Sequence, residues 1–567
     1  AGTMILFQSC EEYLDKEPES EGMTDEEVFT DYLKFRQFED RMYQDMHNHL
    51  GWDVSFISAL CDEGYTISEW ETLPIVQAGN WLRAYNLGGA TQFYDIWGSW
   101  ESIRIANISL NKLDMLEGNA TQEQIDELKG QAHFMRAWYY FEFLRRQGGM
   151  PYITEPLDPG SNFALPRLSY YETAQNIAAD CDTAAALLPD RWDNANIGRP
   201  TKGAAMAVKA TALLYAASPT NNENNDVARW EEAANASWDL IEFAQNTGRY
   251  ELMECNGTET LEYMTPDGVE TIEYTSGFDS IFMYTQYNDE IIWENYPASP
   301  DWTTFTVPSL AGGGQLQGYS VSKNMVDKFE TKDGYDIEDD PNYNPQDPNV
   351  NRDPRFYHSI LFNRQRWTTN SGLYLELWNG GRERTGEQYY NYTGYMARKY
   401  WPTYLNQWSN SSAPPMHVIY LRYADLLLQY AEAANEIGGP THSVGGANMT
   451  AVEALNMVRN RVGMPDFPSG ASQDEFREQI KQERAVELFL EGQRFFDLKR
   501  WHDSHKAEHR EIWGVQIEPS SGAPTGYSYQ RSSEPVITLS FQEKHYRFPI
   551  PTQDANMFEE FQQNPGW

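Results

Sequence analysis

The sequence predicts a mainly α-helical protein, and three observations support this fold class. Long stretches near both ends of the 567-residue chain carry apolar residues at helical spacing. Two of these stretches start at a Thr that can cap a helix. Helix pairs recur at about the length of a tetratricopeptide repeat, and Ala137 followed by Phe141 fits the A-x3-F element of that repeat. We therefore expect tetratricopeptide-like helix pairs in an α-α superhelical scaffold, joined to a loop-rich, irregular half that carries the binding site.

The N-terminal part, residues 24–250, is expected to hold the helical repeats. Thr24 is followed by three acids, as at the start of a helix, and Thr121 with Gln124 forms the pattern of a capping box. The helices are expected at about 24–38, 93–113, 121–146, 170–188, 201–217 and 231–245. The stretch 201–217 is rich in Ala, which lets helices approach closely, so we interpret these pairs as a rigid scaffold rather than a peptide-binding solenoid.

Helical periodicity fails between residues 251 and 415, which belong to the expected C-terminal part, 251–567. This segment is rich in Gly, Asn, Pro, Trp and Tyr, and a similar irregular segment covers residues 51–89. A long irregular stretch inside a compact protein is usually functional. The three glycines 312–314 do not form a phosphate loop, because no Gly-Lys-Ser or Gly-Lys-Thr follows them.

Near the C-terminus, residues 420–439 predict a helix, and Asp474–Trp501 predicts one long helix. The long helix carries a charged row on one side, formed by Glu483, Glu487, Glu491 and Arg494. Apolar residues flank the row, so part of it is expected to be covered, and a covered carboxylate must be paired. The acids are either catalytic groups or metal ligands, or they form an ion-pair lattice that locks the helix. We favour the lattice, since the row contains no His or Cys. The nearest cations in sequence are Arg484, Arg494 and Arg500.

Composition excludes some function classes. The chain has 43 Lys and Arg against 84 Asp and Glu, a net charge of −41, so nucleic acid is not an expected partner. No apolar run approaches the roughly 20 residues that span a bilayer.

Cys61, Cys181 and Cys255 show no CxxC pair or metal spacing. A disulfide bridge from Cys61 to either of the other two is the alternative to free thiols.

The N-terminus predicts a lipid anchor. A short apolar run from Met4 to Phe7 precedes Ser9 and Cys10, which is typical of the end of a lipoprotein signal peptide. Residues 1–9 are then the remnant of that signal, Cys10 is the lipidated residue, and residues 10–23 are the tether.

Several stretches, in order along the chain, resemble the SusD/RagB family of outer-membrane nutrient-binding lipoproteins. They are Arg136–Pro156, the RDPRF element within 344–361, the helix at 420–439, the stretch 455–465, ERAVELFLEGQRFFDLKRW at 483–501, and the terminal 548–567. The resemblance implies that the parts 24–250 and 251–567 pack together as one globular unit. It also implies a lipid-anchored protein on the cell surface that closes like a lid on a SusC-like TonB-dependent transporter, binds an oligosaccharide, and has no catalytic residues.

The family's binding sites are assembled from the early irregular segment and the loop-rich middle. Sugar rings stack on aromatic faces, and their hydroxyls bind polar side chains. The expected stacking platforms are Trp70, Trp81, Trp293, Trp302, Trp367 and Trp378, and the expected polar clamps are Asp62 and Arg366.

Other possibilities stay open. A few members of the family bind peptides instead of glycans. A glycoside hydrolase would need two carboxylates about 5 to 9 Å apart, which a sequence so rich in acids does not exclude. A cytoplasmic repeat adaptor disagrees with the lipoprotein-like start. No cofactor is expected, and Asp336, Glu338, Asp339 and Asp340 form either a loose calcium site or a solvated acidic loop.

Overall fold

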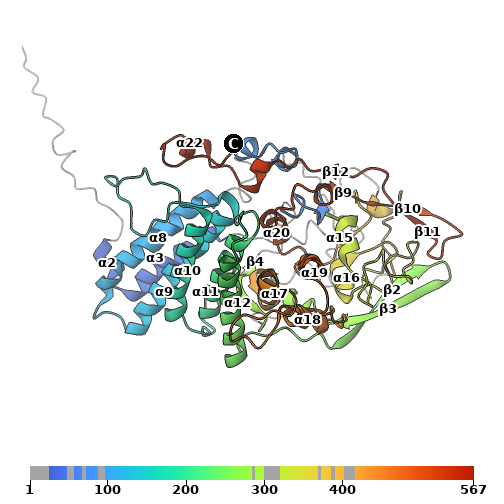
Figure 1. Cartoon of the computed structure of the whole chain (residues 1–567), viewed down its shortest axis with the longest axis horizontal. Helices are drawn as coiled ribbons and strands as arrows, with labels where there is room; N and C mark the ends of the chain where they lie inside the picture. The colour runs from blue at the N-terminus through green and yellow to red at the C-terminus, as the bar shows by residue number, and fades with distance from the viewer. Residues whose placement is uncertain are drawn as a thin grey trace, which may run out of the picture.

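The computed structural model describes residues 24–46, 57–66, 72–86, 96–283, 288–298, 319–367, 372–384, 390–400 and 416–567. Long helices stand side by side in one half of the molecule, and short strands and irregular chain fill the other half (Figure 1). The mainly α-helical fold class is therefore confirmed.

The helical half is a row of helices that follow one another in the chain. In this row, α8 packs against α9, α9 against α10, α10 against α11, and α11 against α12 (Figure 1). Their bounds are Ser99–Lys112 for α8, Gln122–Gln147 for α9, Tyr170–Leu187 for α10, Lys202–Ala217 for α11 and Val227–Thr247 for α12. At the start of the row lie α2 (Asp25–Phe29), α3 (Tyr32–Glu39) and η1 (Asp40–Asp45). The expected start of a helix near Phe93 lies outside the described residues.

Local signals explain these helix boundaries. The predicted capping box is present at α9, where Thr121 accepts the N–H of Gln124 and the Gln124 side chain accepts the N–H of Thr121. Asp31 caps α3 by accepting the N–H of Lys34, so the helix predicted at 24–38 is divided at Thr30 into α2 and α3. Most of α11 is buried, and its Ala side chains allow α10 and α12 to pack closely on it.

The C-terminal helices extend the same row, because α12 packs against α17. These helices are α17 (Tyr423–Gly438), α18 (Ala451–Arg461), α19 (Gln473–Glu487) and α20 (Arg494–Arg500). One cluster of buried apolar side chains runs through both parts of the chain, from Met42 to Ile550.

The prediction of one long helix over Asp474–Trp501 is wrong. The chain breaks between α19 and α20, where Leu490 and Gly492 have φ values of 58° and 74°. Gly492 is the one local signal for this break, and the sequence analysis did not use it, because the residues around it tolerate a helix. The break is stabilised from elsewhere in the fold, because the Leu490 N–H donates to the buried carboxylate of Glu63 at 3.0 Å.

The other half contains short antiparallel sheets. A four-stranded sheet has the order β1 (Gly64–Tyr65), β5 (Ser320–Val321), β7 (Met396–Ala397) and β6 (Ile360–Leu361). The two-stranded sheets are β2 (Gly257–Thr265) with β3 (Gly268–Ser276), β4 (Ile291–Ala298) with β8 (Met416–Arg422), β10 (Val515–Pro519) with β11 (Tyr527–Arg531), and β9 (Glu511–Ile512) with β12 (Ile537–Thr538). The four-stranded sheet connects residues from three regions that are far apart in sequence.

The β2–β3 hairpin is the main regular element that the sequence analysis missed within 251–415. Its nine residue pairs run from Gly257 with Ser276 to Thr265 with Gly268. Both strands are rich in Thr and contain Tyr, which favour strands, and Pro266-Asp267 separates them, so a strand signal was present in the sequence.

Short helices connect the remaining segments. They are α5 (Thr72–Gln77), α6 (Trp81–Asn86), η2 (Ile96–Gly98), η3 (Leu113–Leu116), α13 (Ser280–Met283), α15 (Lys323–Lys328), α16 (Pro354–Ser359), η5 (Arg382–Arg384), α21 (Ala507–Arg510), η6 (Glu543–Tyr546) and α22 (Thr552–Ala555). In the part of the chain that the structure describes, no helix combines the length and the apolar character needed to cross a bilayer.

Candidate functional site

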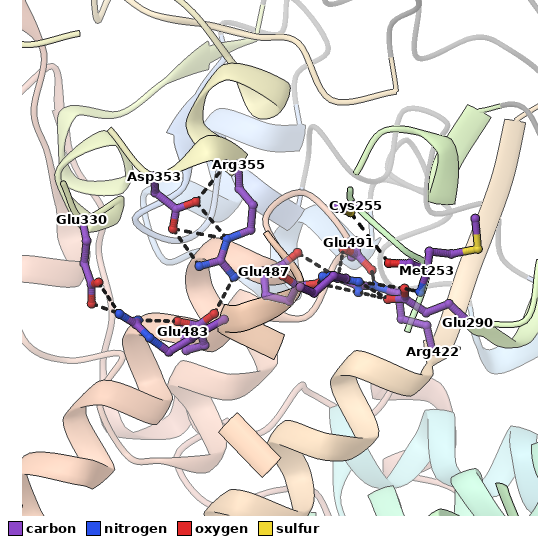
Figure 2. A network of polar contacts seen from close by, with 12 residues as sticks. Met253, Cys255, Glu290, Glu330, Asp353, Arg355, Arg422, Glu483, Glu487 and Glu491 are labelled. Atoms are coloured by element: carbon purple, nitrogen blue, oxygen red, sulfur yellow. Dashed lines mark hydrogen bonds and ion pairs between the residues drawn. The ribbon is translucent and has the colours of Figure 1, made fainter. Parts of the chain in front are cut away.

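The acids of the charged row are all buried and ion-paired (Figure 2). Glu487 accepts from Arg355 at 2.9 Å, from Arg422 at 2.7 Å and from Arg461. Glu483 accepts from Arg355 and from Arg459 at 3.0 Å. Burial alone raises the pKa of Glu487, but Arg461, Arg422 and Arg355 together hold that pKa well below its usual range. Glu487 therefore stays ionised, and both carboxylates are bound to arginines.

This arrangement confirms the ion-pair lattice. The arginines come from α16, β8 and α18, so the lattice ties α19 to three separate elements. The catalytic interpretation of the row fails, because all three acids are buried and ion-paired, and the pKa values of Glu487 and Glu491 are lowered instead of raised as in a general acid.

The nearest cations in sequence have other partners. Arg484 binds Asp425 at 2.7 Å and Asp497 at 2.9 Å. Arg500 binds Glu432 at 2.7 Å through its second terminal nitrogen. The sequence analysis missed Arg355, Arg422, Arg459 and Arg461 as partners of the row, although Arg355 lies in the RDPRF element, which resembles the family.

The prediction of Asp62 as a polar clamp for ligand is wrong. Its side chain is fully buried and accepts from Arg494 at 2.7 and 2.9 Å and from His509 at 2.8 Å. Although burial alone raises it, the pKa of Asp62 lies well below its usual range because Arg494 and His509 favour the charged form. Asp62 is a buried link between the early segment and α20.

The prediction that Trp81, Trp293 and Trp367 are stacking platforms is also wrong. Each of these side chains is only 2–3% exposed. Trp81 stacks on His545 with ring centroids 4.6 Å apart, and Trp293 meets Phe134 edge to face at 4.9 Å. Polar neighbours in sequence do not exclude burial, because a large ring gains more from packing than a small one. Trp70 and Trp302 lie outside the described residues.

Trp378 and Arg366 are the predicted site residues that reach the surface in the described part. Trp378 is partly exposed and lies beside Tyr527, with centroids 6.3 Å apart. Arg366 donates to Glu262 at 2.6 Å in a half-exposed pair. Arg366 pairs through its backbone with Tyr374, whereas Asn379, next to Trp378, donates its N–H to the carbonyl of Ile517 in β10.

A cluster of three tyrosines, which the sequence analysis missed, lies near Trp378. This tyrosine cluster consists of Tyr65, Tyr390 and Tyr392. The ring centroids of Tyr65 and Tyr392 are 5.2 Å apart at 85°, and those of Tyr390 and Tyr392 are 4.8 Å apart at 64°. All three side chains are partly exposed. Tyr65 comes from the early irregular segment and the other two from the loop-rich middle, the two segments from which a site was expected.

Backbone contacts fix the cluster. Gly64 in β1 lies so close to β5 that a Cβ atom there would sit 2.4 Å from the ring of Tyr319 and 2.6 Å from the carbonyl of Ser320. Only Gly allows this approach, which places Tyr65 next to β5. On the other side, the N–H of Tyr392 donates to the hydroxyl of Ser320 at 3.2 Å.

Arg384 joins the tyrosine cluster to β10. Its guanidinium donates to the carbonyl of Tyr392 at 3.5 Å and to the carbonyl of Val515 at 2.9 Å, and it lies 5.8 Å from the ring centroid of Tyr390. The neighbour of Trp378 also binds this strand, because the N–H of Asn379 donates to the carbonyl of Ile517 in β10.

Tyr65 and Tyr392 keep neutral hydroxyls. Burial raises the pKa of Tyr65 above its ordinary value, and the neighbouring Tyr392 adds to this effect. Burial and Tyr390 raise the pKa of Tyr392. A neutral phenol combines a flat apolar ring with a group that both donates and accepts a hydrogen bond. This combination suits a ligand with apolar faces and many hydroxyls.

Two cavities walled by described residues are too small for such a ligand. One, of about 20 Å³, lies between Cys61, Trp81 and His509, and the other, of about 10 Å³, lies between Trp138, Tyr420 and Gln493. Each holds about one water molecule. Neither cavity can hold a sugar ring.

The structure also bears on the expectations for the cysteines and for the acidic loop at 336–340. Cys61, Cys181 and Cys255 are free and buried, so a bridge between them is excluded. The acids at 336–340 do not converge as a ligand group within the described residues, because Asp336 accepts from Gln482 at 2.7 Å and Asp340 accepts the N–H of Asn342 at 2.8 Å. Cys10 lies outside the described residues.

Two family profiles and several known proteins are similar to this chain. A family profile described as "SusD family" matches residues 278–567, just over half of the chain, and one described as "Starch-binding associating with outer membrane" matches residues 12–214. SusD-like protein P2 of Formosa agariphila is 24% identical over 412 residues, which are 70% of this chain and 69% of that protein.

Solved structures show the same fold. A SusD-like protein from Bacteroides fragilis superposes with a TM-score of 0.74 at 22% identity, over 95% of this chain and 98% of the other. A SusD-like carbohydrate binding protein, also from Bacteroides fragilis, gives a TM-score of 0.70 at 20% identity, over 94% of this chain and all of the other.

Proposed function

Because this chain belongs to the SusD family, we propose that it is a cell-surface lipoprotein that binds an oligosaccharide and passes it to a SusC-like TonB-dependent transporter in the outer membrane. The family description of residues 12–214 names starch binding and the outer membrane, and a structural neighbour is named as carbohydrate binding. Both descriptions support a glycan as the ligand and the outer surface of the cell as the location.

The tyrosine cluster is the observation that carries this proposal. Sugar rings present flat C–H faces that pack on aromatic rings, and their hydroxyls exchange hydrogen bonds with phenols. The ring of Tyr392 lies 5.2 Å from that of Tyr65 and 4.8 Å from that of Tyr390, and it is inclined to them by 85° and 64°. The three rings therefore present faces in different orientations over a distance comparable to one sugar ring. Trp378 and Tyr527 form a second aromatic pair, which we take as a contact for further units of the same chain.

Capture without cleavage is the proposed activity. The acids of the charged row are bound to arginines and are not available as catalysts. Release to the transporter requires weak binding at each ring, which fits a partly exposed surface where water competes for every sugar hydroxyl.

The proposed anchor is a lipid on Cys10. Mass spectrometry of the protein purified from membranes should find acyl chains on this residue. A Cys10→Ala variant should be lost from the membrane fraction, and an unmodified Cys10 in the native protein would refute the anchor.

A glycan array followed by calorimetry tests the ligand and the site together. We expect binding of an oligosaccharide, and a loss of affinity of about two- to tenfold for each of Tyr65→Ala and Tyr392→Ala. Tyr335→Ala is the matched control, because Tyr335 is 51% exposed and does not belong to the cluster.

Three results would overturn parts of the proposal. Binding of oligopeptides and no glycan would assign a peptide ligand. Turnover of a bound glycan by the pure protein would show an enzyme. Equal affinity of Tyr65→Ala, Tyr392→Ala and the control would remove the tyrosine cluster from the site.

A further inference from the structure

Three side chains that no part of the proposed function uses converge at the base of the β2–β3 hairpin. They are Glu259 in β2, Asp279 in the turn before α13, and His358 in α16. One ligand atom of each lies within 4.8 Å of those of the other two. Among the residues that the structure describes, no other group of three or more His, Cys, Asp or Glu side chains converges in this way.

His358 has the hydrogen bonding of a histidine that binds metal. Its Nε2 lies 2.8 Å from the carbonyl oxygen of Thr275. A carbonyl can only accept, so Nε2 carries the proton and the neutral ring has its lone pair on Nδ1. Metal-binding histidines are usually held in this way, with the second nitrogen donating to a carbonyl or carboxylate.

The Nδ1 atom of His358 is buried and has no hydrogen-bond partner. The side chain is 1% exposed, and Nδ1 faces Asp279 Oδ1 at 3.8 Å. Buried polar atoms are rarely left without a partner, so an orphaned nitrogen that faces a carboxylate indicates a missing ligand. Packing fixes the ring, which meets Tyr274 edge to face at 5.0 Å.

The carboxylates are placed by the backbone around the hairpin. Glu259 lies opposite Tyr274 in the strand register, and the Tyr274 hydroxyl donates to it at 2.8 Å. Gly277 has a φ of 101°, which turns the chain between β3 and Asp279. A Cβ at that position would sit 3.0 Å from the carbonyl of Glu254.

Arg398 is the cation nearest to this group. Its Nη2 lies 3.9 Å from Glu259 and 4.0 Å from Asp279, beyond hydrogen-bond distance for both. Its Nη1 donates instead to the Tyr274 hydroxyl at 3.2 Å and to the carbonyl of Tyr357. Both carboxylates therefore keep lone pairs for another cation, and their two negative charges match a divalent one.

We propose that Glu259, Asp279 and His358 bind a zinc ion that fastens the β2–β3 hairpin to α16. One imidazole nitrogen and two carboxylate oxygens are common zinc ligands, with bonds of about 2.0 to 2.2 Å, so ligand atoms in a tetrahedral site lie about 3.4 Å apart. The observed 3.8 Å between His358 and Asp279 needs only a small closure. Water takes the fourth position on the exposed side, where Glu259 meets solvent. Calcium and magnesium prefer oxygen ligands and are disfavoured by the imidazole.

The first test is zinc binding to the whole protein. Calorimetry with zinc chloride should show one tight site in the wild type. The variants His358→Gln and Glu259→Gln should each weaken binding by at least about tenfold. His442→Gln is the matched control, because His442 lies outside the group and should be replaced without effect. Glu259 is partly exposed, so Glu259→Gln remains informative if His358→Gln fails to fold.

The second test locates the ion and its effect. Crystals grown with zinc should show an anomalous peak between the three side chains. Hydrogen exchange in residues 257–276 should slow on addition of zinc in the wild type and not in Glu259→Gln. Unchanged affinity in both variants would overturn the proposal, as would a peak elsewhere, for example at His502 and His505, whose rings lie 5.4 Å apart on another face.

Discussion

Arg422 and Glu491 form a two-point ion pair in the interior, with Nε and Nη2 of the arginine 2.7 and 2.8 Å from the two carboxylate oxygens. The same guanidinium also donates to Glu290 and Glu487, each at 2.7 Å (Figure 2). One arginine from β8 thus binds three carboxylates from two distant parts of the chain. Its removal leaves three buried negative charges with fewer partners.

We expect Arg422→Met to lower the free energy of unfolding by about 3 to 5 kcal/mol, the usual cost of breaking a buried ion pair from one side. Urea unfolding at neutral pH measures this change. Arg41→Ala is the control, because Arg41 and Glu101 form an exposed pair at 2.6 Å, which should contribute less than about 1 kcal/mol. Similar losses in the two variants would show that burial does not set the strength of the lattice.

The stability that Glu63 contributes to the fold should fall as the pH rises. Burial raises the pKa of this carboxyl to about 7. The folded state therefore holds a proton that the unfolded state releases above about pH 4.3. The stability that this group contributes is fully present below that pH and is lost as the pH rises to about 7.

We expect Glu63→Gln to stabilise the protein at pH 8 by about 3 kcal/mol, because the amide is neutral and its oxygen can still accept the N–H of Leu490. At pH 4.5 the two proteins should unfold at nearly the same urea concentration. The comparison isolates Glu63, since other titrating groups are common to both proteins. A constant difference between pH 4.5 and 8 would contradict the raised pKa.

Lys499 is a buried ammonium group that lies over aromatic rings. Its Nζ is 4.1 Å from the ring centroid of Phe548 and 5.5 Å from that of Trp81, and it has no hydrogen-bond partner. Burial, Arg547 and Arg146 hold its pKa well below the ordinary value. We expect Lys499→Met to raise the free energy of unfolding at pH 7 by about 1 to 3 kcal/mol.

The pH dependence gives the check on Lys499. A lowered pKa makes the wild type gain stability as the pH rises towards 10, where the unfolded chain also loses the proton. The advantage of Lys499→Met should therefore shrink between pH 7 and pH 10. Destabilisation at every pH would show that the ammonium group is bound favourably by the rings.

The helical scaffold could be predicted because its signals are local. Apolar spacing and the Thr121–Gln124 capping box lie within one helix, and the structure confirms them. The break before α20 has one local signal, Gly492, but the positive φ of Leu490 depends on Glu63, more than 400 residues away in sequence. The same limit applies to the lattice. Its existence followed from covered acids, but Arg355 and Arg422 reach α19 only through the fold.

The candidate site could be predicted only as two segments. Tyr65 and Tyr392 come together because β1 pairs with β5, a contact between residues far apart in sequence. The choice of Trp as platforms was wrong for Trp81 and Trp293, because composition does not tell whether a ring packs inward.

The contrast between buried and exposed rings gives the last prediction. Trp81→Ala should lower the free energy of unfolding by about 3 to 5 kcal/mol, because the ring contacts His545, Phe548 and Phe495 in the core. Glycan affinity of the folded fraction should stay within twofold of the wild type. Tyr65→Ala should do the reverse, with less than about 1 kcal/mol of stability lost and weaker binding. Urea unfolding and calorimetry on the same samples separate the two effects. Loss of binding in a well-folded Trp81→Ala protein would return Trp81 to the site and show that the core around it opens when a ligand binds.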